Sequence, residues 1–238
     1  MRNIRAILRK ELGTYFASPM AYIMAGVFLA LTGVFFVNSV DQPFAEASVR
    51  GLLATSSFFL LTLVSPLLTM RLFAEEQKLG TLELLLTAPV RDYEVVVAKF
   101  LASFVMLASM ALATLFYAAL LAYYADPDLG PTFSAYVGFL LYGAATLAMG
   151  LLASTLSSNQ IVAAVVGFGL ILVFTLVDQV SNILSGTVAR VLERLSLSAH
   201  FDAFNRGVID TADIAYFLIL MAVFLFLTIR SVESRRWR

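Results

Sequence analysis

The sequence predicts an all-α membrane protein with six transmembrane helices and both termini in the cytoplasm. Of its 238 residues, 61% are hydrophobic and 13% are charged, whereas a soluble domain is roughly half apolar and a quarter charged. The hydrophobic residues come in runs of about twenty, the length that crosses a hydrocarbon core about 30 Å thick. Lysine and arginine gather at alternate ends of these runs. We therefore expect one transmembrane domain over residues 1–238.

Residues 1–18 predict a helix that lies along the membrane surface. Its apolar side chains can share one side and its basic side chains another. The apolar set is Ile4, Ile7, Leu8, Leu12, Tyr15 and Phe16, and the basic set is Arg2, Arg5, Arg9 and Lys10. Ser18-Pro19 is expected to end this helix. The apolar run that follows is too long and begins too late for a signal peptide, so we expect it to be a retained first span.

Six apolar runs predict the six spans. They cover roughly Met20–Val40, Gly51–Leu72, Val95–Tyr123, Thr132–Leu156, Ile161–Val177 and Ile214–Ile229. Pro66 predicts a kink in the second span. Gly138, Gly143 and Gly150 would let another helix approach the fourth span closely.

The distribution of positive charge predicts the orientation. With the N-terminus in the cytoplasm, 12 of the 16 lysines and arginines lie inside and four lie outside, namely Arg50, Arg190, Arg194 and Arg206. The positive-inside rule favours this arrangement. An odd number of spans would leave one basic terminus outside.

The segment 183–212 lies on the outer face in this topology. Val188, Val191, Leu192 and Leu195 have helical spacing and predict a short amphipathic helix, with charged residues opposite. Asp178, at the end of the fifth span, is either an intramembrane functional carboxylate or a hydrated helix-end residue. Its expected depth favours the second interpretation.

The segment 71–94 is the only sizeable polar stretch on the cytoplasmic side between spans. The second span is expected to continue as helix to about Leu79, where Gly80 ends it and Thr81 becomes the N-cap of a second, short helix. Leu82, Leu85 and Leu86 would share one exposed face, with Glu83 in the first turn and Pro89 at the end. Such a face needs a protein partner or lipid.

This segment resembles permease subunits of type-2 ABC exporters. The pattern is Ala74-Glu75-Glu76, then Gly80-Thr81-Leu82-Glu83-Leu84-Leu85, then Ala88-Pro89-Val90 and Lys99. The resemblance is closest to the small six-span subgroup that includes gliding-motility and nitrous-oxide-reductase maturation permeases. It covers essentially the whole chain, including the amphipathic start and the stretch LSLSAHFDAFNRGVID before the sixth span.

The resemblance implies a pair of permease subunits, identical or homologous, driven by two cytoplasmic ATPase subunits. The helix near Thr81–Thr87 would be the coupling helix, with coupling residues Glu75, Glu76, Gly80, Thr81, Leu82, Glu83, Leu85 and Leu86. It further implies a bacterial-type plasma (inner) membrane, export of an unidentified substrate, and a subunit interface that includes the first, second and fifth spans. A re-entrant outer helix pair would gate the exit or cap the bundle.

Several chemistries are disfavoured by the residues themselves. The chain has no cysteine and one histidine, so thiolate and histidine metal sites are not expected. None of the thirteen glycines is followed by lysine, so the chain has no P-loop. No catalytic triad or metalloprotease motif occurs. We therefore expect no cofactor, no enzyme activity on this chain and no nucleic-acid partner, with ATP hydrolysed on another chain.

Two other functions stay open at this point. A scaffold or passive channel would need no ATPase, and the leucine face would then lie on lipid. An intramembrane enzyme would need a polar cluster at mid-depth. Ser56, Ser57, Thr62 and Ser65 could line a polar path or bond their own helix backbone. Arg235, Arg236 and Arg238 are expected to fix the topology or to bind anionic lipid or the ATPase.

Overall fold

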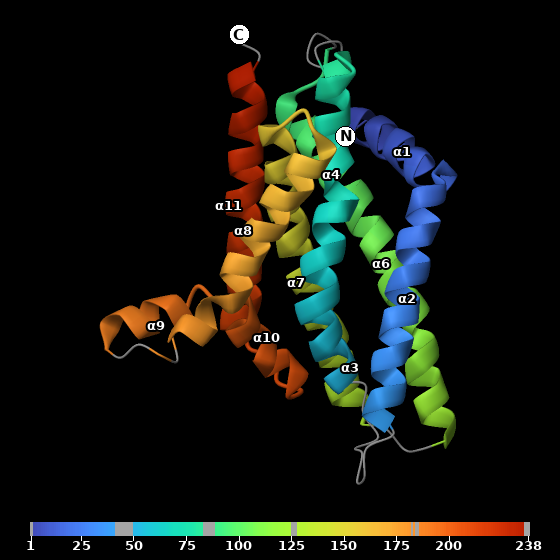
Figure 1. The fold of residues 1–238 in the computed structure, drawn as a ribbon, viewed down its shortest axis with the longest axis vertical. Coiled ribbons are helices and arrows are strands. Elements are labelled where there is room, and N and C mark those ends of the chain that lie inside the picture. The colour runs from blue at the N-terminus through green and yellow to red at the C-terminus, as the bar shows by residue number, and fades with distance from the viewer. Residues whose placement is uncertain are drawn as a thin grey trace.

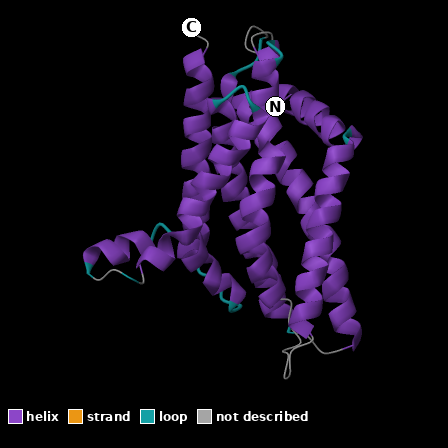
Figure 2. Cartoon of the chain, in the orientation of Figure 1, coloured by secondary structure: helices purple, strands orange, loops and turns teal. Residues whose placement is uncertain are grey.

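The computed structural model describes residues 2–40, 50–82, 89–124, 128–181, 183 and 186–235. The described residues form helices joined by short turns, with no strand among them (Figure 2). The elements are α1 (Arg2–Ala17), α2 (Pro19–Val40), α3 (Arg50–Thr55), the π-helical turn η1 (Ser56–Leu61), α4 (Thr62–Lys78), α6 (Asp92–Tyr124), α7 (Leu129–Leu156), α8 (Gln160–Ser181), α9 (Thr187–Glu193), α10 (Leu197–Asn205) and α11 (Thr211–Arg235).

Within the described residues, six helices are long and apolar enough to cross a membrane. They are α2, the combined η1 and α4, α6, α7, α8 and α11. The chain is therefore an all-α polytopic membrane protein, as the hydrophobic runs predict. Figure 1 shows the C-terminus and α1 at the same end of the bundle, with the end of α4 and the start of α6. The positive-inside rule makes this end the cytoplasmic one.

The second span is one continuous helix from α3 through η1 to α4. It extends to Lys78, which confirms that it continues beyond its apolar run. Pro66 lies inside α4, which continues through this residue as a helix. The span departs from α-helical hydrogen bonding at the π-helical turn η1, which precedes Pro66. Ser65 reaches across to the Thr146 hydroxyl of α7 at 2.8 Å, whereas Thr62 donates to the Phe58 carbonyl of its own span at 2.5 Å.

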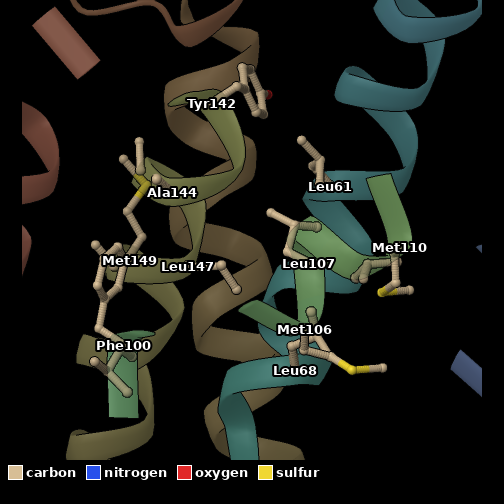
Figure 3. Close-up of a cluster of buried hydrophobic side chains, with 14 of the residues drawn as sticks. Leu61, Leu68, Phe100, Met106, Leu107, Met110, Tyr142, Ala144, Leu147 and Met149 are labelled. Carbon is tan, nitrogen blue, oxygen red and sulfur yellow. The ribbon is translucent and has the colours of Figure 1, made fainter. Parts of the chain in front are cut away.

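The core of the bundle is built around α7. Buried residues make up 78% of the apolar stretch of α7 but only 17% of that of α11. Figure 3 shows apolar side chains of η1, α4, α6 and α7 meeting there, including Leu61, Leu107 and Leu147. A side chain at Gly150 would collide with the Thr69 hydroxyl, and one at Gly143 with Leu107. The prediction that glycines of this span permit close helix contact is confirmed.

At the outer end lie the short helices α9 and α10, and α9 ends at Glu193, before Leu195 of the predicted amphipathic helix. α9 has no buried residue and projects sideways from the bundle (Figure 1). α10 packs against α7, where a Cβ at Gly138 would lie 2.5 Å from the Phe204 Cβ. His200 holds this segment to α11, with its Nδ1 2.6 Å from Asp213 Oδ1. Asp178 lies three residues before the end of α8 and is partly buried, so the structure puts it near the helix end.

Candidate functional site

The candidate site lies at the cytoplasmic end, where α4 leaves the bundle and α6 re-enters it. The predicted coupling segment 71–94 joins these two helices. Residues 83–88 lie outside the described part of the chain, and with them Glu83, Leu85 and Leu86. The structure describes both helical supports of this segment, and α1 packs beside them (Figure 1).

Four charged side chains from α1, α4 and α6 meet at these supports, and we call them the charged junction: Lys10, Glu11, Glu76 and Lys99. Lys99 is buried, and its Nζ lies 2.9 Å from Oε1 of Glu11 and 2.9 Å from Oε1 of Glu76. Lys10 Nζ approaches the same two oxygens, at 3.6 Å and 3.2 Å. The junction therefore has two cations and two carboxylates, and its charges balance.

The electrostatics of the junction follow from burial. An ammonium group removed from water is strongly destabilising unless carboxylates replace its hydration, and Lys99 has two. Its Nζ also lies 5.3 Å from the centre of the Phe73 ring. Partial burial lowers the pKa of Lys10, but Glu76 and Glu11 outweigh this effect, and the pKa is raised on balance. The contacts of Lys10 and Lys99 with Glu11 and Glu76 therefore join α1, α4 and α6.

The side of α1 that faces the protein carries polar groups as well as apolar ones, and these polar groups contact the junction and α4. Glu11 and Tyr15 are one turn apart on this side, and both are buried. The Tyr15 hydroxyl donates to the Leu68 carbonyl of α4 at 2.6 Å, and the Arg71 guanidinium lies 4.3 Å from the centre of its ring. Burial raises the pKa of Tyr15, so the phenol stays a neutral donor. α1 is thus fixed against protein along this side.

A second polar contact joins α1 to the start of α6. Glu94 Oε2 accepts hydrogen bonds from the Asn3 side chain and from the Arg91 backbone N–H, each at 3.0 Å. A carboxylate in the first turn of a helix satisfies a backbone donor that has no partner within the helix. Glu94 therefore caps α6 and holds the beginning of α1 at the same time.

The C-terminal end of α7 braces the last turns of α4. The Ser154 hydroxyl accepts from the backbone N–H groups of Phe73 and Ala74, at 3.0 Å and 3.2 Å, and donates to the Met70 carbonyl at 2.9 Å. The Gln77 side chain donates to the carbonyls of Ser154 and Thr155. The α4 helix is thus held by α7 on one side and by the charged junction on another.

The structure places five of the eight predicted coupling residues. Glu76 is a member of the junction, and Glu75 lines a pocket beside it. Gly80 has a φ of 70°, a left-handed conformation that suits glycine and ends α4 as predicted. The Thr81 hydroxyl donates to the Glu76 carbonyl at 3.4 Å, whereas the predicted N-cap would accept a bond. Leu82 is only 5% exposed, so the prediction of an exposed leucine face is wrong at this residue.

The pocket beside the junction has a volume of about 250 Å³. It is lined by Lys10, Glu11, Thr14, Arg71, Leu72, Glu75, Glu76, Leu79, Thr81 and Lys99. No group of three metal-binding side chains occurs among the residues that the structure describes. The ion pairs of the charged junction are suited to holding α1, α4 and α6 against one another.

Sequence reasoning missed Glu11 and Ser154, although Lys99 and Glu76 stand in the quoted motif. The available signal for Glu11 was its position between Ile7 and Tyr15, four residues from each, on the apolar side of the first helix. A carboxylate in such a stripe needs a buried cation. Ser154 gave no signal, because a serine near a helix end more often bonds its own backbone.

A family model described as "ABC-2 family transporter protein" matches residues 6–235. The chain belongs to this family. A comparison with curated proteins returned no match. The match begins inside α1 and ends at the last residue of α11, so this ABC-2 permease carries the junction and all six spans within its family domain. The family assignment makes the chain the membrane subunit of a transporter, without catalytic activity of its own.

Proposed function

We propose that this ABC-2 permease is the membrane subunit of an ATP-driven exporter in a bacterial-type plasma membrane. Separate cytoplasmic ATPase subunits drive it, and it pairs with a second permease, identical or homologous. The family match and the six apolar helices support a permease. The sequence has no P-loop, which supports ATP hydrolysis on another chain. Its resemblance to the gliding-motility and nitrous-oxide-reductase maturation permeases supports the subgroup and outward transport of a substrate still to be identified.

The observation that carries the proposal is the charged junction at the base of the segment 71–94. Glu76 lies two residues before the end of α4, and Lys99 lies in the second turn of α6. Their ion pair therefore clamps the two helices between which the predicted coupling helix is suspended. A push on that helix then moves α4 and α6 together, because each helix is rigid and the clamp resists their separation.

α1 extends the same connection to the first span. Glu11 joins α1 to the clamp through Lys99, and α1 leads into α2 through Ser18 alone. A displacement of the clamp is therefore passed to α2 as well as to α4 and α6. Three of the six spans would therefore respond to one contact with the ATPase.

The test is co-purification of partners from the native membrane in mild detergent, with mass spectrometry. We expect a P-loop ATPase to accompany the wild-type chain and to be lost with Leu85→Glu. Val191→Glu on the exposed, outer α9 places the same charge change far from the segment and should keep the ATPase. If no ATPase accompanies the intact wild-type protein, the exporter proposal fails and a scaffold or channel takes its place.

A further inference from the structure

One side of α1 carries two arginines that take no part in the charged junction. Successive residues of an α-helix are about 100° apart, so the sides of α1 can be separated by position. Glu11 and Tyr15 point into the protein, and Lys10 lines the pocket of the charged junction. Arg5 and Arg9, one turn apart, are exposed on another side.

This side of α1 carries a second pocket of about 530 Å³. Arg5, Ala6, Leu8, Arg9 and Leu12 line it. The two leucines are partly buried, because their inner surfaces pack against the core. The lining therefore combines two basic residues with apolar ones.

The two arginines differ from Lys10, which lies on the same helix. Lys10 is paired with Glu11 and Glu76. Among the described residues, no ion pair involves Arg5 or Arg9. Their charge is therefore available to an anionic group from outside the described chain.

The position of α1 indicates where this anion comes from. α1 ends at Ala17 and the first span begins at Pro19, so the helix leaves the bilayer surface directly. Phe16 and Met20, on either side of this joint, are 46% and 45% exposed, as expected for residues in contact with lipid. The cytoplasmic leaflet carries the anionic headgroups that attract basic segments near a span.

We propose that the side of α1 formed by Arg5, Leu8, Arg9 and Leu12 binds an anionic phospholipid of the cytoplasmic leaflet. The two guanidinium groups bind the phosphate, for which their planar donor geometry is suited. The acyl chain lies on the leucines and continues toward Phe16 at the membrane boundary. A zwitterionic lipid is disfavoured, because its quaternary ammonium group is repelled by the same arginines.

The experiment is native mass spectrometry of the purified chain in mild detergent, with equal amounts of phosphatidylglycerol and phosphatidylcholine. We expect the wild type to retain phosphatidylglycerol in preference. Arg5→Gln/Arg9→Gln should lower the ratio of the two retained lipids by about tenfold or more, since each basic residue near an anionic surface contributes a several-fold effect. Arg5→Lys/Arg9→Lys keeps the charge and should keep most of the preference.

The matched control is Arg190→Gln/Arg194→Gln, within and directly after the outer α9, which removes the same charge from the opposite end. It should leave the ratio unchanged. An unchanged ratio in the α1 double glutamine variant, or equal retention of both lipids by the wild type, overturns the proposal. So does a variant that keeps the lipid ratio but loses a co-purifying protein, which would make this side a contact for an acidic protein. If the double variant does not fold, Arg9→Gln alone should lower the ratio by about threefold.

Discussion

Replacing Lys99 by methionine removes the buried cation that two carboxylates share in the charged junction. Methionine has nearly the volume of the lysine stem, so the packing of α6 against Phe73 is largely kept. What changes is the charge around Glu11 and Glu76, whose side chains are only 9% and 14% exposed. Lys10 is then the cation left in the junction, and Arg71 lines the same pocket.

The expected effect on the free energy of unfolding can be worked out from these contacts. Removal of one partner from a buried ion pair destabilises a protein by about 3–5 kcal/mol. Lys99 contacts two carboxylates at 2.9 Å, which argues for the upper part of this range, but Lys10 remains near both and reduces the loss. We expect about 3 kcal/mol for Lys99→Met. Lys10→Met should change stability by about 0–1 kcal/mol, because the Lys10 side chain is 63% exposed and screened by solvent.

The assay is unfolding of the purified variants in mixed detergent micelles with increasing dodecyl sulfate, followed by far-ultraviolet circular dichroism. A triple variant, Lys99→Met/Glu11→Gln/Glu76→Gln, separates the loss of charge balance from the loss of packing. It should be more stable than Lys99→Met alone, since no uncompensated carboxylate remains. If Lys99→Met changes the free energy of unfolding by less than about 0.5 kcal/mol, or if the triple variant is the less stable of the two, the reasoning about the junction is refuted.

Three further substitutions test how the coupling segment is supported. Gly150→Leu should lower stability by about 1–3 kcal/mol, because its side chain would collide with the Thr69 hydroxyl. Gly169→Leu, in open space, is the control. Equal melting temperatures of the two variants in detergent would contradict the close contact of α7 with α4 at Gly150. Gly80→Val should destabilise by about 1–2 kcal/mol because a branched side chain opposes its φ of 70°, and Gly80→Asn should destabilise less; the reverse order in thermal unfolding would count against this account. Ser154→Ala should cost about 1–2 kcal/mol through its lost bonds to α4, and faster amide hydrogen exchange confined to the end of α4 would locate the effect.

The predicted spans agree with the structure because each can be read from its own segment. Transfer of a run of about twenty apolar residues into the bilayer is favourable whatever the rest of the chain does. The extension of α4 to Lys78 could also be predicted from its own segment, since it depended on Gly80, which ends the helix. Span ends moved by only a few residues, as at α6, which begins at Asp92 where Glu94 caps it.

The leucine face was a different kind of inference and failed at Leu82. Helical spacing shows which side chains share a side but not whether that side meets solvent or another helix. Leu82 is in the buried core, because the chain turns back at Gly80 and brings it against the bundle. Burial of this kind depends on where the chain goes next, and sequence spacing does not contain that information.

By itself the sequence determined the fold class, the number of spans and the expected orientation. These properties come from the interaction of each segment with lipid and water, which act on local composition and charge. Only the tertiary structure decided that Glu11 meets Lys99, although 88 positions separate them, and that Ser154 bonds the backbone of α4. Such contacts join residues that are remote in sequence. They exist because the helices pack in one arrangement, in which these buried polar and charged groups find partners.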